Sequence, residues 1–339
     1  MKPEDRFVEK LRALLSPDES VLLGPGDDAA VVASSAETLV ITTDMLVESV
    51  DFLPGEDPEV IGRRAVAVNA SDLAAMGARP RWFLLSIGLA RLDEATALAV
   101  AQGAIGRGKE WGAQLVGGDL SRAPATVVSV AMWGLPEGEP MTRAGASAGD
   151  LVYVSGFPGR AAAGLRLARR LSEFSGQGTA PLPRFGGLSV SHVEELLRAY
   201  RDPEARVTLG TELARARIAT AAIDVSDGLG VDAGRLARAS GVGLDIEGRA
   251  LPVASALQTF SELEDLHAVD LAVSGGDDYE LLFCVAESAA ASVQAIARKV
   301  GVPLTRIGRA RSGAGVTLRE GRREREIGDS GHDHFETPR

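Results

Sequence analysis

The sequence contains a single cysteine, and only four of its 36 basic residues are lysines. One cysteine excludes both an intrachain disulfide and a zinc site built from several thiolates. That residue, Cys284, ends the apolar run Leu281–Cys284, a pattern that predicts a buried structural thiol. Because lysine is so scarce, we expect contacts with phosphate groups to come from arginine or from a bound metal ion.

Long apolar runs and excess positive charge are also missing. No apolar run approaches the length of about 20 residues that a transmembrane helix needs, and the first ten residues lack the apolar segment of a signal peptide. We therefore expect a cytoplasmic protein that does not contact membranes. The formal net charge of −11 argues against nucleic acid as a partner, because a phosphate backbone binds to a basic surface. Small molecules are the expected partners.

The 339 residues are enough for two domains, each with its own hydrophobic core. The small-residue segment Gly145–Asp150 precedes a new strand pattern and predicts a boundary, with an N-terminal domain over residues 1–148 and a C-terminal domain over residues 149–339. Residues 173–188 are expected to form a loop. Apolar periodicity predicts helices over residues 4–15, 58–77, 93–111, 159–172, 228–239 and 287–300, and strands over residues 39–44, 124–134, 151–155, 220–225, 279–284 and 304–309. This mixture of helices and strands indicates an α/β or α+β fold.

Acidic residues recur at positions where open sheets gather ligands. Six short motifs carry them, and five of the six place the acid at a strand end or after a glycine turn. The motifs are Asp27-Asp28, Thr42-Thr43-Asp44, Asp72, Gly117-Gly118-Asp119, Asp224–Asp227 and Asp277-Asp278. Each motif alone has an ordinary structural explanation, such as a solvated loop or a helix cap. Asp227, for example, could cap the helix that is predicted to begin at residue 228.

Asp72 is the most informative of these acids, because it interrupts the apolar face of a predicted helix. In helix 58–77 it shares one face with apolar residues such as Val68, and this face should be buried. A carboxylate that faces a core costs several kcal/mol unless it is paired or bound to a metal. An ion pair with Arg63 or Arg64 is the structural alternative. Since Arg63 points away from this face and Arg64 lies only at its flank, we favour a ligand role.

If the acidic motifs converge in the fold, their carboxylates require bound cations. Two carboxylates about 4 Å apart repel each other by roughly 4 kcal/mol at an effective dielectric constant of about 20. Oxygen ligands from aspartate and threonine, without histidine or cysteine, suit Mg²⁺ rather than zinc. Mg²⁺ held by scattered carboxylates typically carries nucleotide phosphates. The pattern therefore predicts a magnesium-dependent enzyme that uses a nucleotide.

Two formal matches to catalytic motifs fail on their structural context. Gly103–Lys109 fits the first seven positions of a P-loop, but Glu110 stands where serine or threonine should bind Mg²⁺, and the preceding segment is helical. Gly145–Gly149 fits a nucleophile elbow, which needs a strand before it, whereas here a strand follows. The histidine pair His332 and His334 is expected to be solvated rather than bound to metal.

Taken together and in order, the motifs resemble those of the thiamine-monophosphate kinase family. The matching segments are Gly26–Ala30, Thr42–Asp44, Val68–Gly77, Gly117–Asp119, Thr142–Gly145, Ile223–Leu229 and Ser274–Leu281. The combination is typical of the superfamily that also contains aminoimidazole ribonucleotide synthetase and selenophosphate synthetase. The glycine pair followed by Asp277-Asp278-Tyr279-Glu280 is similar to the kinase branch.

The resemblance implies an N-terminal sheet domain that dimerises and a C-terminal α/β domain that completes the active site. It implies several Mg²⁺ ions, held by Asp28, Thr42, Thr43, Asp44, Asp72, Asp119, Asp224 and Asp227. ATP, bound in a cleft that depends on the homodimer, would contact Gly118, Asp119, Arg143 and Ser226. The implied activity is direct in-line transfer of a phosphate from ATP to thiamine monophosphate. An acceptor that is itself a phosphate needs no general base, which agrees with the lack of a catalytic histidine.

Three residues of the expected acceptor pocket depart from the family pattern. Asp51 stands where the family has a histidine, Asp277 replaces a glutamate, and His332 falls near a usual aromatic residue. These three are the expected substrate-binding residues, so the motifs specify phosphoryl transfer more closely than they specify its acceptor. Two alternatives remain open. One is another ATP-using branch of the superfamily, either an amidine-forming ligase or a kinase of a different phosphomonoester, and the other is a non-catalytic protein that binds Mg²⁺ or nucleotide.

Overall fold

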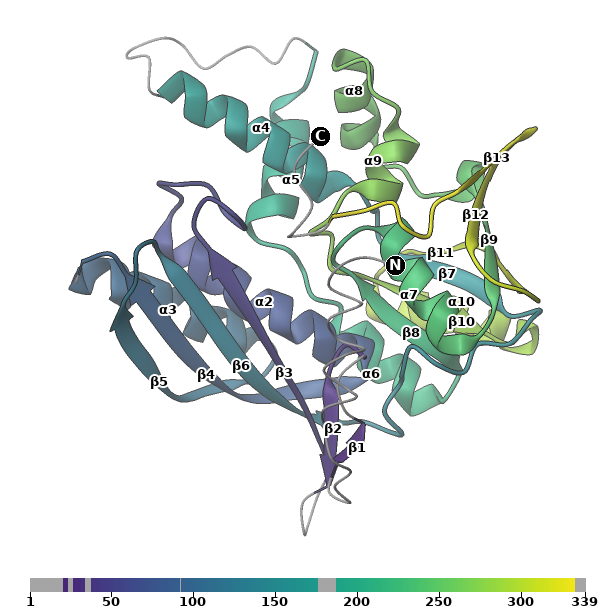
Figure 1. Ribbon diagram of the computed structural model, residues 1–339, viewed down its shortest axis with the longest axis horizontal. Helices are drawn as coiled ribbons and strands as arrows, with labels where there is room; N and C mark the ends of the chain where they lie inside the picture. The colour runs from purple at the N-terminus through teal and green to yellow at the C-terminus, as the bar shows by residue number, and fades with distance from the viewer. Residues whose placement is uncertain (1–20, 24–26, 34–37, 92, 176–186, 333–339) are drawn as a thin grey trace.

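The computed structural model describes residues 21–23, 27–33, 38–91, 93–175 and 187–332. These residues form two β-sheets with helices packed against them, which confirms the expected α/β class (Figure 1). The helix expected over residues 4–15 lies outside the described residues, as does most of the loop expected over residues 173–188. None of the helices in the described ranges is both long and apolar enough to span a membrane.

The N-terminal sheet has the strand order β1-β2-β3-β6-β4-β5. Its strands are β1 Val21–Leu23, β2 Ala30–Ala33, β3 Thr38–Val47, β4 Ala78–Leu89, β5 Gln114–Arg122 and β6 Val127–Pro136. Among these strands β4 and β5 pair in parallel, and the other neighbours pair in an antiparallel manner. Side chains along β6 alternate between buried and half-buried positions, as expected for a sheet with one covered face.

Helices α2 (Pro58–Ala75) and α3 (Glu94–Glu110) cover that face of the sheet (Figure 1). The two helices pack so closely that a Cβ atom at Gly103 would lie 1.9 Å from the carbonyl oxygen of Glu59. A glycine is therefore needed at this helix contact for packing. The segment Gly103–Lys109 lies inside α3, which confirms that it is not a P-loop.

The second sheet has the strand order β13-β12-β9-β11-β7-β10-β8. Its strands are β7 Leu151–Ser155, β8 Ala219–Val225, β9 Gly243–Glu247, β10 Glu280–Val285, β11 Leu304–Arg311, β12 Val316–Glu320 and β13 Arg323–Glu326. Every residue of β7 and β10 is buried. The reason is that alternate residues of β7 pack into different cores, Leu151 and Tyr153 into one and Val152 and Val154 into the other.

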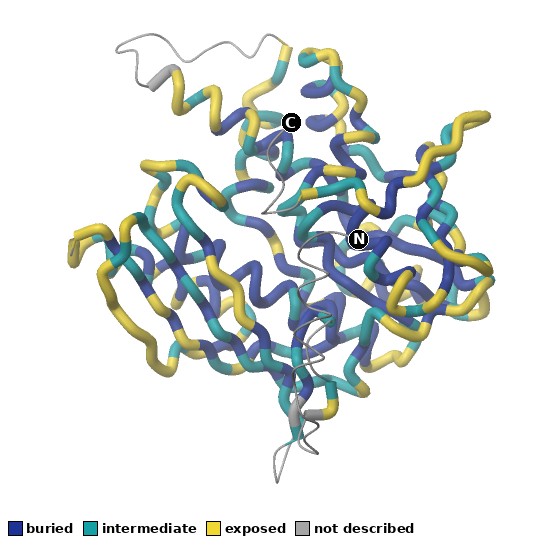
Figure 2. The backbone as a smooth tube through the Cα atoms, viewed as in Figure 1, coloured by how far each residue is buried: buried dark blue, intermediate teal, exposed yellow. Residues whose placement is uncertain are grey.

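Further helices surround the second sheet and connect it to the first. They are α4 Arg160–Ser175, α5 Val190–Arg201, α6 Val207–Ala216, α7 Leu229–Ser240, α8 Ser255–Leu263, α9 Ala268–Ser274 and α10 Ala290–Val300. Helix α6 packs against α2 of the N-terminal half. Phe83 of β4 and Phe283 of β10 belong to the same hydrophobic core. Figure 2 shows buried segments in both sheets and in the helices between them, so one core joins the two halves.

Strand β3 extends beyond its expected end, and strand β5 runs through the glycine pair of an acidic motif. β3 continues to Val47, so Asp44 lies inside the strand and not at its C-terminal end. β5 continues to Arg122, so the glycine pair before Asp119 does not end the strand. A Cβ atom at Gly118 would lie 1.8 Å from the carbonyl oxygen of Leu85 on β4. The glycine therefore permits a close approach between two paired strands.

Candidate active site

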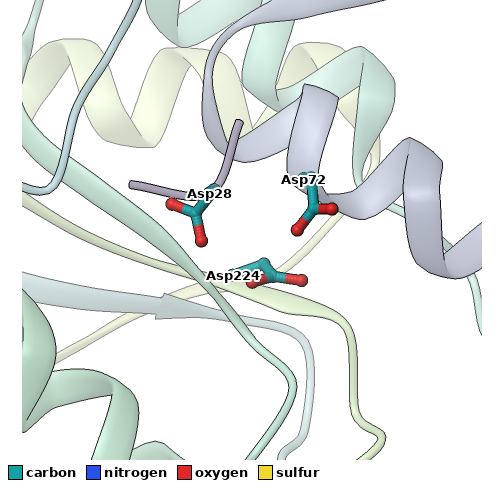
Figure 3. Close-up of side chains that lie close together, drawn as sticks. All are labelled: Asp28, Asp72 and Asp224. Carbon is teal, nitrogen blue, oxygen red and sulfur yellow. The ribbon is translucent and has the colours of Figure 1, made fainter. Parts of the chain in front are cut away.

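Three aspartates from three separate elements meet at the junction of the two sheets, and we call them the aspartate trio (Figure 3). Asp28 precedes β2, Asp72 lies on α2, and Asp224 lies near the end of β8. Each carboxylate offers an oxygen atom, and these atoms all lie within 4.8 Å of one another. Asp28 and Asp224 are buried, and Asp72 is half-buried. The fold thus brings three of the six acidic motifs together.

Two hydroxyl groups donate hydrogen bonds to the aspartate trio. Thr42 Oγ1 donates to Asp72 Oδ2 over 2.5 Å, and Ser71 Oγ donates to Asp224 Oδ2 over 2.6 Å. Thr42 reaches the trio because β3 packs against α2. Ser71 was not selected from the sequence. The signal that could have identified it is a group of polar residues, Asn69, Ser71 and Asp72, in the otherwise apolar second half of α2.

Neither arginine that was considered as a partner for Asp72 pairs with it. Arg63 Nη2 lies 3.0 Å from Asp202 Oδ2, and Arg64 Nη2 lies 2.9 Å from Asp277 Oδ1. The structural alternative for Asp72 is therefore wrong. Its carboxylate faces Thr42 and the other two acids instead.

Burial and mutual repulsion act together on the aspartate trio. Burial raises the pKa of Asp72 well above its usual range, and the carboxylates of Asp44 and Asp224 raise it further. Burial likewise raises the pKa of Asp224, with repulsion from Asp28 as the next cause. Asp28 Oδ2 is buried and has no hydrogen-bond partner among the described residues. A bound cation would supply that partner and stabilise all three charges at once.

The donor atoms fit Mg²⁺ better than a softer metal. The grouped ligand atoms are all carboxylate oxygens, and the only cysteine is buried in β10. Hard oxygen donors of this kind are typical of Mg²⁺ and Ca²⁺ sites. Mg²⁺ is usually bound by a few carboxylates together with substrate phosphates. The residues present therefore suit a site whose remaining ligands are the phosphates of a bound nucleotide.

Arg143 contacts the aspartate trio through Asp28. Its Nη2 atom lies 2.7 Å from Asp28 Oδ1, and its backbone N–H donates to the Asp27 carboxylate over 3.1 Å. Burial raises the pKa of Asp27 to about 6, while repulsion from Asp28 adds to the shift and Arg143 opposes it. Arginine binds phosphate and carboxylate through the same planar fork of N–H groups. The position of Arg143 is therefore compatible with the expected contact to ATP.

The three motif residues of β3 lie on different faces of the strand. Thr43 is exposed, and its Oγ1 donates to the Val130 carbonyl over 2.9 Å. Asp44 lies on the same side as Thr42 because side chains alternate along a strand, and its charge raises the pKa of Asp72. The structure therefore brings Thr42 into contact with the trio and places Asp44 near enough for its charge to act on Asp72, but it directs the side chain of Thr43 to the other face.

The turn before α7 is held by Asp232, a buried residue that was not selected from the sequence. Its Oδ2 atom accepts hydrogen bonds from the backbone N–H groups of Ser226, Asp227 and Gly228, each over 3.1 Å. Gly228 is the N-cap residue of α7, so the alternative that Asp227 caps this helix is wrong. The Asp227 carboxylate instead lies 2.5 Å from Arg235 Nη1 and is not part of the trio. An acid in the first turn of a helix was the available signal for Asp232.

Asp119 and Gly118 lie on β5, the edge strand of the N-terminal sheet. Asp44 of β3 is in register with Val130 of β6. Leu85 of β4 is in register with both Val130 and Gly118. Three strand spacings of about 4.8 Å therefore separate Gly118 from Asp44. Within one chain, the structure does not bring Asp119 to the aspartate trio.

The three expected acceptor-pocket residues make different contacts. Asp51 Oδ2 accepts a hydrogen bond over 2.7 Å from the backbone N–H four residues earlier. Asp277 pairs with Arg64, as described above. His332 is exposed, and its backbone N–H donates to the Asp227 carbonyl over 2.7 Å, which places this segment beside the start of α7. Of the three, Asp277 has the contact that connects the two halves of the chain.

Comparisons with known proteins agree with this architecture. Residues 26–135 match the AIR synthase related protein, N-terminal domain, and residues 147–320 match the AIR synthase related protein, C-terminal domain. The sequence is 35% identical to the thiamine-monophosphate kinase of Salmonella typhimurium, and the match covers 98% of this chain and 97% of that protein.

Two solved structures show the same likeness in three dimensions. AaThiL complexed with AMPPCP and TMP superposes with a TM-score of 0.78 at 29% identity, covering 95% of both chains. Thiamine-monophosphate kinase from Stenotrophomonas maltophilia K279a superposes with a TM-score of 0.74 at 37% identity, covering 93% of this chain and 96% of that one. With its full-length match to curated relatives and its two matched domains, this chain belongs to the thiamine-monophosphate kinase family.

Proposed function

We propose that this chain transfers the terminal phosphate of ATP to thiamine monophosphate and releases thiamine diphosphate and ADP. The observation that carries the proposal is the aspartate trio, assembled from both halves of a chain of this kinase family. The related AaThiL was solved with AMPPCP and TMP, so a nucleotide analogue and TMP are bound by a protein of the same fold.

The reaction requires charge neutralisation rather than acid–base catalysis. The acceptor is a phosphate monoester that is already anionic near neutral pH, so no residue has to remove a proton from it. The main obstacle is repulsion between two polyanions. A bound Mg²⁺ supplies the positive charge that reduces this repulsion. Direct transfer between two phosphate oxygens requires no protein nucleophile.

We assign the metal-binding role in two groups. The inner group is the aspartate trio with Thr42 and Asp44, because Thr42 is hydrogen-bonded to Asp72 and the charge of Asp44 acts on the same residue. The outer group rests on the family resemblance alone, since these side chains lie elsewhere in the single chain. It consists of Thr43, Asp119 and Asp227.

ATP would be held by Arg143 and by the turn that contains Ser226. Arg143 Nε is buried and makes no hydrogen bond in the described part of the chain, and its ion-pair partner Asp27 Oδ1 lies 3.8 Å away, so this donor is not saturated. The backbone N–H of Ser226 is already bonded to Asp232, so a donor from Ser226 to ATP would be its hydroxyl. Gly118 and Asp119, the other two expected ATP contacts, lie on the edge strand.

We further propose that the functional unit is a homodimer. The face of the N-terminal sheet opposite α2 and α3 carries Met45 and Leu84, whose side chains are exposed by 56% and 37%. Asp119 lies on the same face. It is in register with Ser86 of β4, an exposed residue whose neighbours along the strand are buried. An apolar face of this kind is typical of a contact with another protein. A second copy packed on it would surround Asp119, which one chain alone leaves exposed.

An acceptor panel tests the proposed reaction. Purified protein with Mg-ATP is incubated with thiamine monophosphate and with other phosphomonoesters, and ADP and the diphosphate products are measured. We expect thiamine diphosphate to form, and EDTA to stop the reaction. A much faster reaction with another phosphomonoester would mean that the acceptor is wrong and the kinase class is right. If no member of the panel supports ADP formation, the proposal is contradicted.

A further inference from the structure

Arg64 of α2 is a buried cation that the metal site does not use. Its side chain is 3% exposed, and its Nη2 atom lies 2.9 Å from Asp277 Oδ1. Its guanidinium lies over the ring of Tyr200 on α5, 4.8 Å from the ring centroid. The Nε and Nη1 atoms are buried and have no hydrogen-bond partner among the described residues. Because burying an arginine is costly, the Asp277 carboxylate is an essential partner for it.

The two carboxylate oxygens of Asp277 have different surroundings. Oδ1 faces Arg64 Nη2 and also accepts a hydrogen bond from Tyr279 Oη over 3.1 Å. Within the described ranges no donor contacts Oδ2, and the Asp277 side chain is 31% exposed. The protein therefore fixes one oxygen of this partly exposed carboxylate and, within the described residues, provides no donor for the other.

The backbone around Asp277 is also held in an unusual conformation. Asp277 and Tyr279 have φ angles of 67° and 50°, in the left-handed region that non-glycine residues rarely adopt. Their N–H groups donate to the carbonyls of Ser226 and Val225, over 2.7 Å and 2.8 Å. Strained residues persist where their surroundings fix them, and they are concentrated at ligand sites. These bonds tie Asp277 to the turn that directly follows Asp224 of the aspartate trio.

We propose that Arg64 and Tyr279 are positioning residues for the phosphate acceptor and that they act through Asp277. They hold Oδ1, so that Oδ2 presents a fixed negative hydrogen-bond acceptor to the substrate. The matching chemical group is an N–H donor or a cationic heterocycle, and thiamine monophosphate carries both, as an aminopyrimidine and a thiazolium. The inference rests on the proposed function and extends it to residues that do not touch the substrate.

Steady-state kinetics with each substrate varied in turn test the inference. Arg64→Met should raise the KM for thiamine monophosphate about tenfold or more, because a charged contact that orders the binding group is lost. The kcat and the KM for ATP should stay within about twofold of wild type. Arg64→Lys should recover part of the loss, and Tyr279→Phe, a milder change, should raise the acceptor KM by about threefold.

The neighbouring arginine provides a matched control. Arg63→Met removes an arginine from the same helix that pairs with Asp202 and Glu110 instead. It should leave both KM values within about twofold of wild type, and thermal unfolding of every variant shows whether it is folded. A rise of both KM values together in Arg64→Met, with a fall in kcat, would show a structural role and overturn the inference. An unchanged acceptor KM in folded Arg64→Met and Tyr279→Phe would overturn it as well.

A double variant tests whether Arg64 acts through Asp277. Asp277→Asn combined with Arg64→Met should raise the acceptor KM no further than Asp277→Asn alone, and additive effects would contradict the inference.

If the wild-type protein prefers another phosphomonoester, the same KM ratios between variants and wild type are measured with that acceptor. In that case the proposed acceptor is wrong, and the inference is decided by the KM ratios for the acceptor that is turned over. If wild type turns over no phosphomonoester, the inference is tested by calorimetry of thiamine monophosphate binding in the presence of Mg-AMPPCP. Equal affinity of wild type and Arg64→Met for thiamine monophosphate overturns the inference.

Discussion

Asp72 combines burial with repulsion from two neighbouring carboxylates, because burial, Asp44 and Asp224 all raise its pKa. Asp72→Asn keeps the size of the side chain and an oxygen for Thr42, but removes one negative charge. We expect kcat to fall by more than about 100-fold, while the melting temperature in EDTA does not fall. Stabilisation of the fold by Mg²⁺ should be lost, as measured by thermal unfolding with and without the metal.

The control for this change is Asp93→Asn, which alters an exposed N-cap residue of α3 and should leave kcat unchanged. If Asp72→Asn gained as much thermal stability from Mg²⁺ as wild type does, the aspartate trio would not be the metal site.

Cys284 is a second residue with a measurable consequence. It is fully buried in β10, and burial raises its pKa to about 12. Because the thiolate is the reactive form, we expect no labelling of the native protein by a thiol reagent and one equivalent of labelling after denaturation. Rapid labelling of the native protein would contradict the expected structural role.

At the scale of single elements, Asp278 holds the start of α4. Its carboxylate accepts hydrogen bonds from the backbone N–H groups of Gly159 and Ala161, over 2.6 Å and 3.3 Å. Burial raises the pKa of Asp278 to about 8, although these hydrogen bonds oppose the shift. The folded protein therefore binds a proton that the unfolded chain releases near pH 4. This contribution to stability is complete below about pH 4 and is lost as the pH rises through about 8.

Asp278→Asn removes this dependence. Between about pH 5 and 8, the free energy of unfolding of wild type should fall relative to the variant by at most about 1.4 kcal/mol for each pH unit. Urea unfolding at several pH values, in EDTA, measures the difference, and effects of other titrating groups cancel between the two proteins. Parallel pH dependence in both proteins would show that Asp278 titrates normally.

Elements with a continuous apolar face could be predicted from the sequence, and irregular ones could not. The expected helix 58–77 corresponds to α2, and the expected strand 39–44 corresponds to β3 with a longer end. The course of β5 could not be predicted, because the reason for Gly118 is the neighbouring strand β4, which local sequence does not show. Asp232 was missed for a similar reason, since the N–H groups that it binds gather only when the turn before α7 forms.

The same distinction applies to the candidate site. The acids Asp28, Asp72 and Asp224 could be selected because they follow glycine, interrupt an apolar face or end a strand. Their separation of less than 4.8 Å depends on the packing of both sheets and could only be assumed. The exposed position of Asp119 was not predictable, because it follows from strand order across the sheet.

At the scale of the whole molecule, the proposed homodimer gives a further prediction. Leu84→Glu places a charge on the uncovered face of the N-terminal sheet, where burial against a second copy would be costly. We expect a folded monomer with reduced activity, as measured by light scattering after gel filtration and by kinetics. Leu98→Glu is the matched control, because Leu98 is also an exposed leucine (54% exposed, against 37% for Leu84) but lies on α3, off that face. A wild-type monomer, or a dimer that survives Leu84→Glu, would contradict this arrangement.

The aspartate trio draws its members from distant parts of the chain, and this affects how the protein is made. During synthesis, the first sheet and α2 emerge well before β8, so Asp28 and Asp72 can be placed while Asp224 is still absent. A nascent chain at that stage has two crowded carboxylates, an incomplete core and no complete metal site. We therefore expect the protein to acquire its metal only after the ribosome has passed β10, when the second sheet can close against the first.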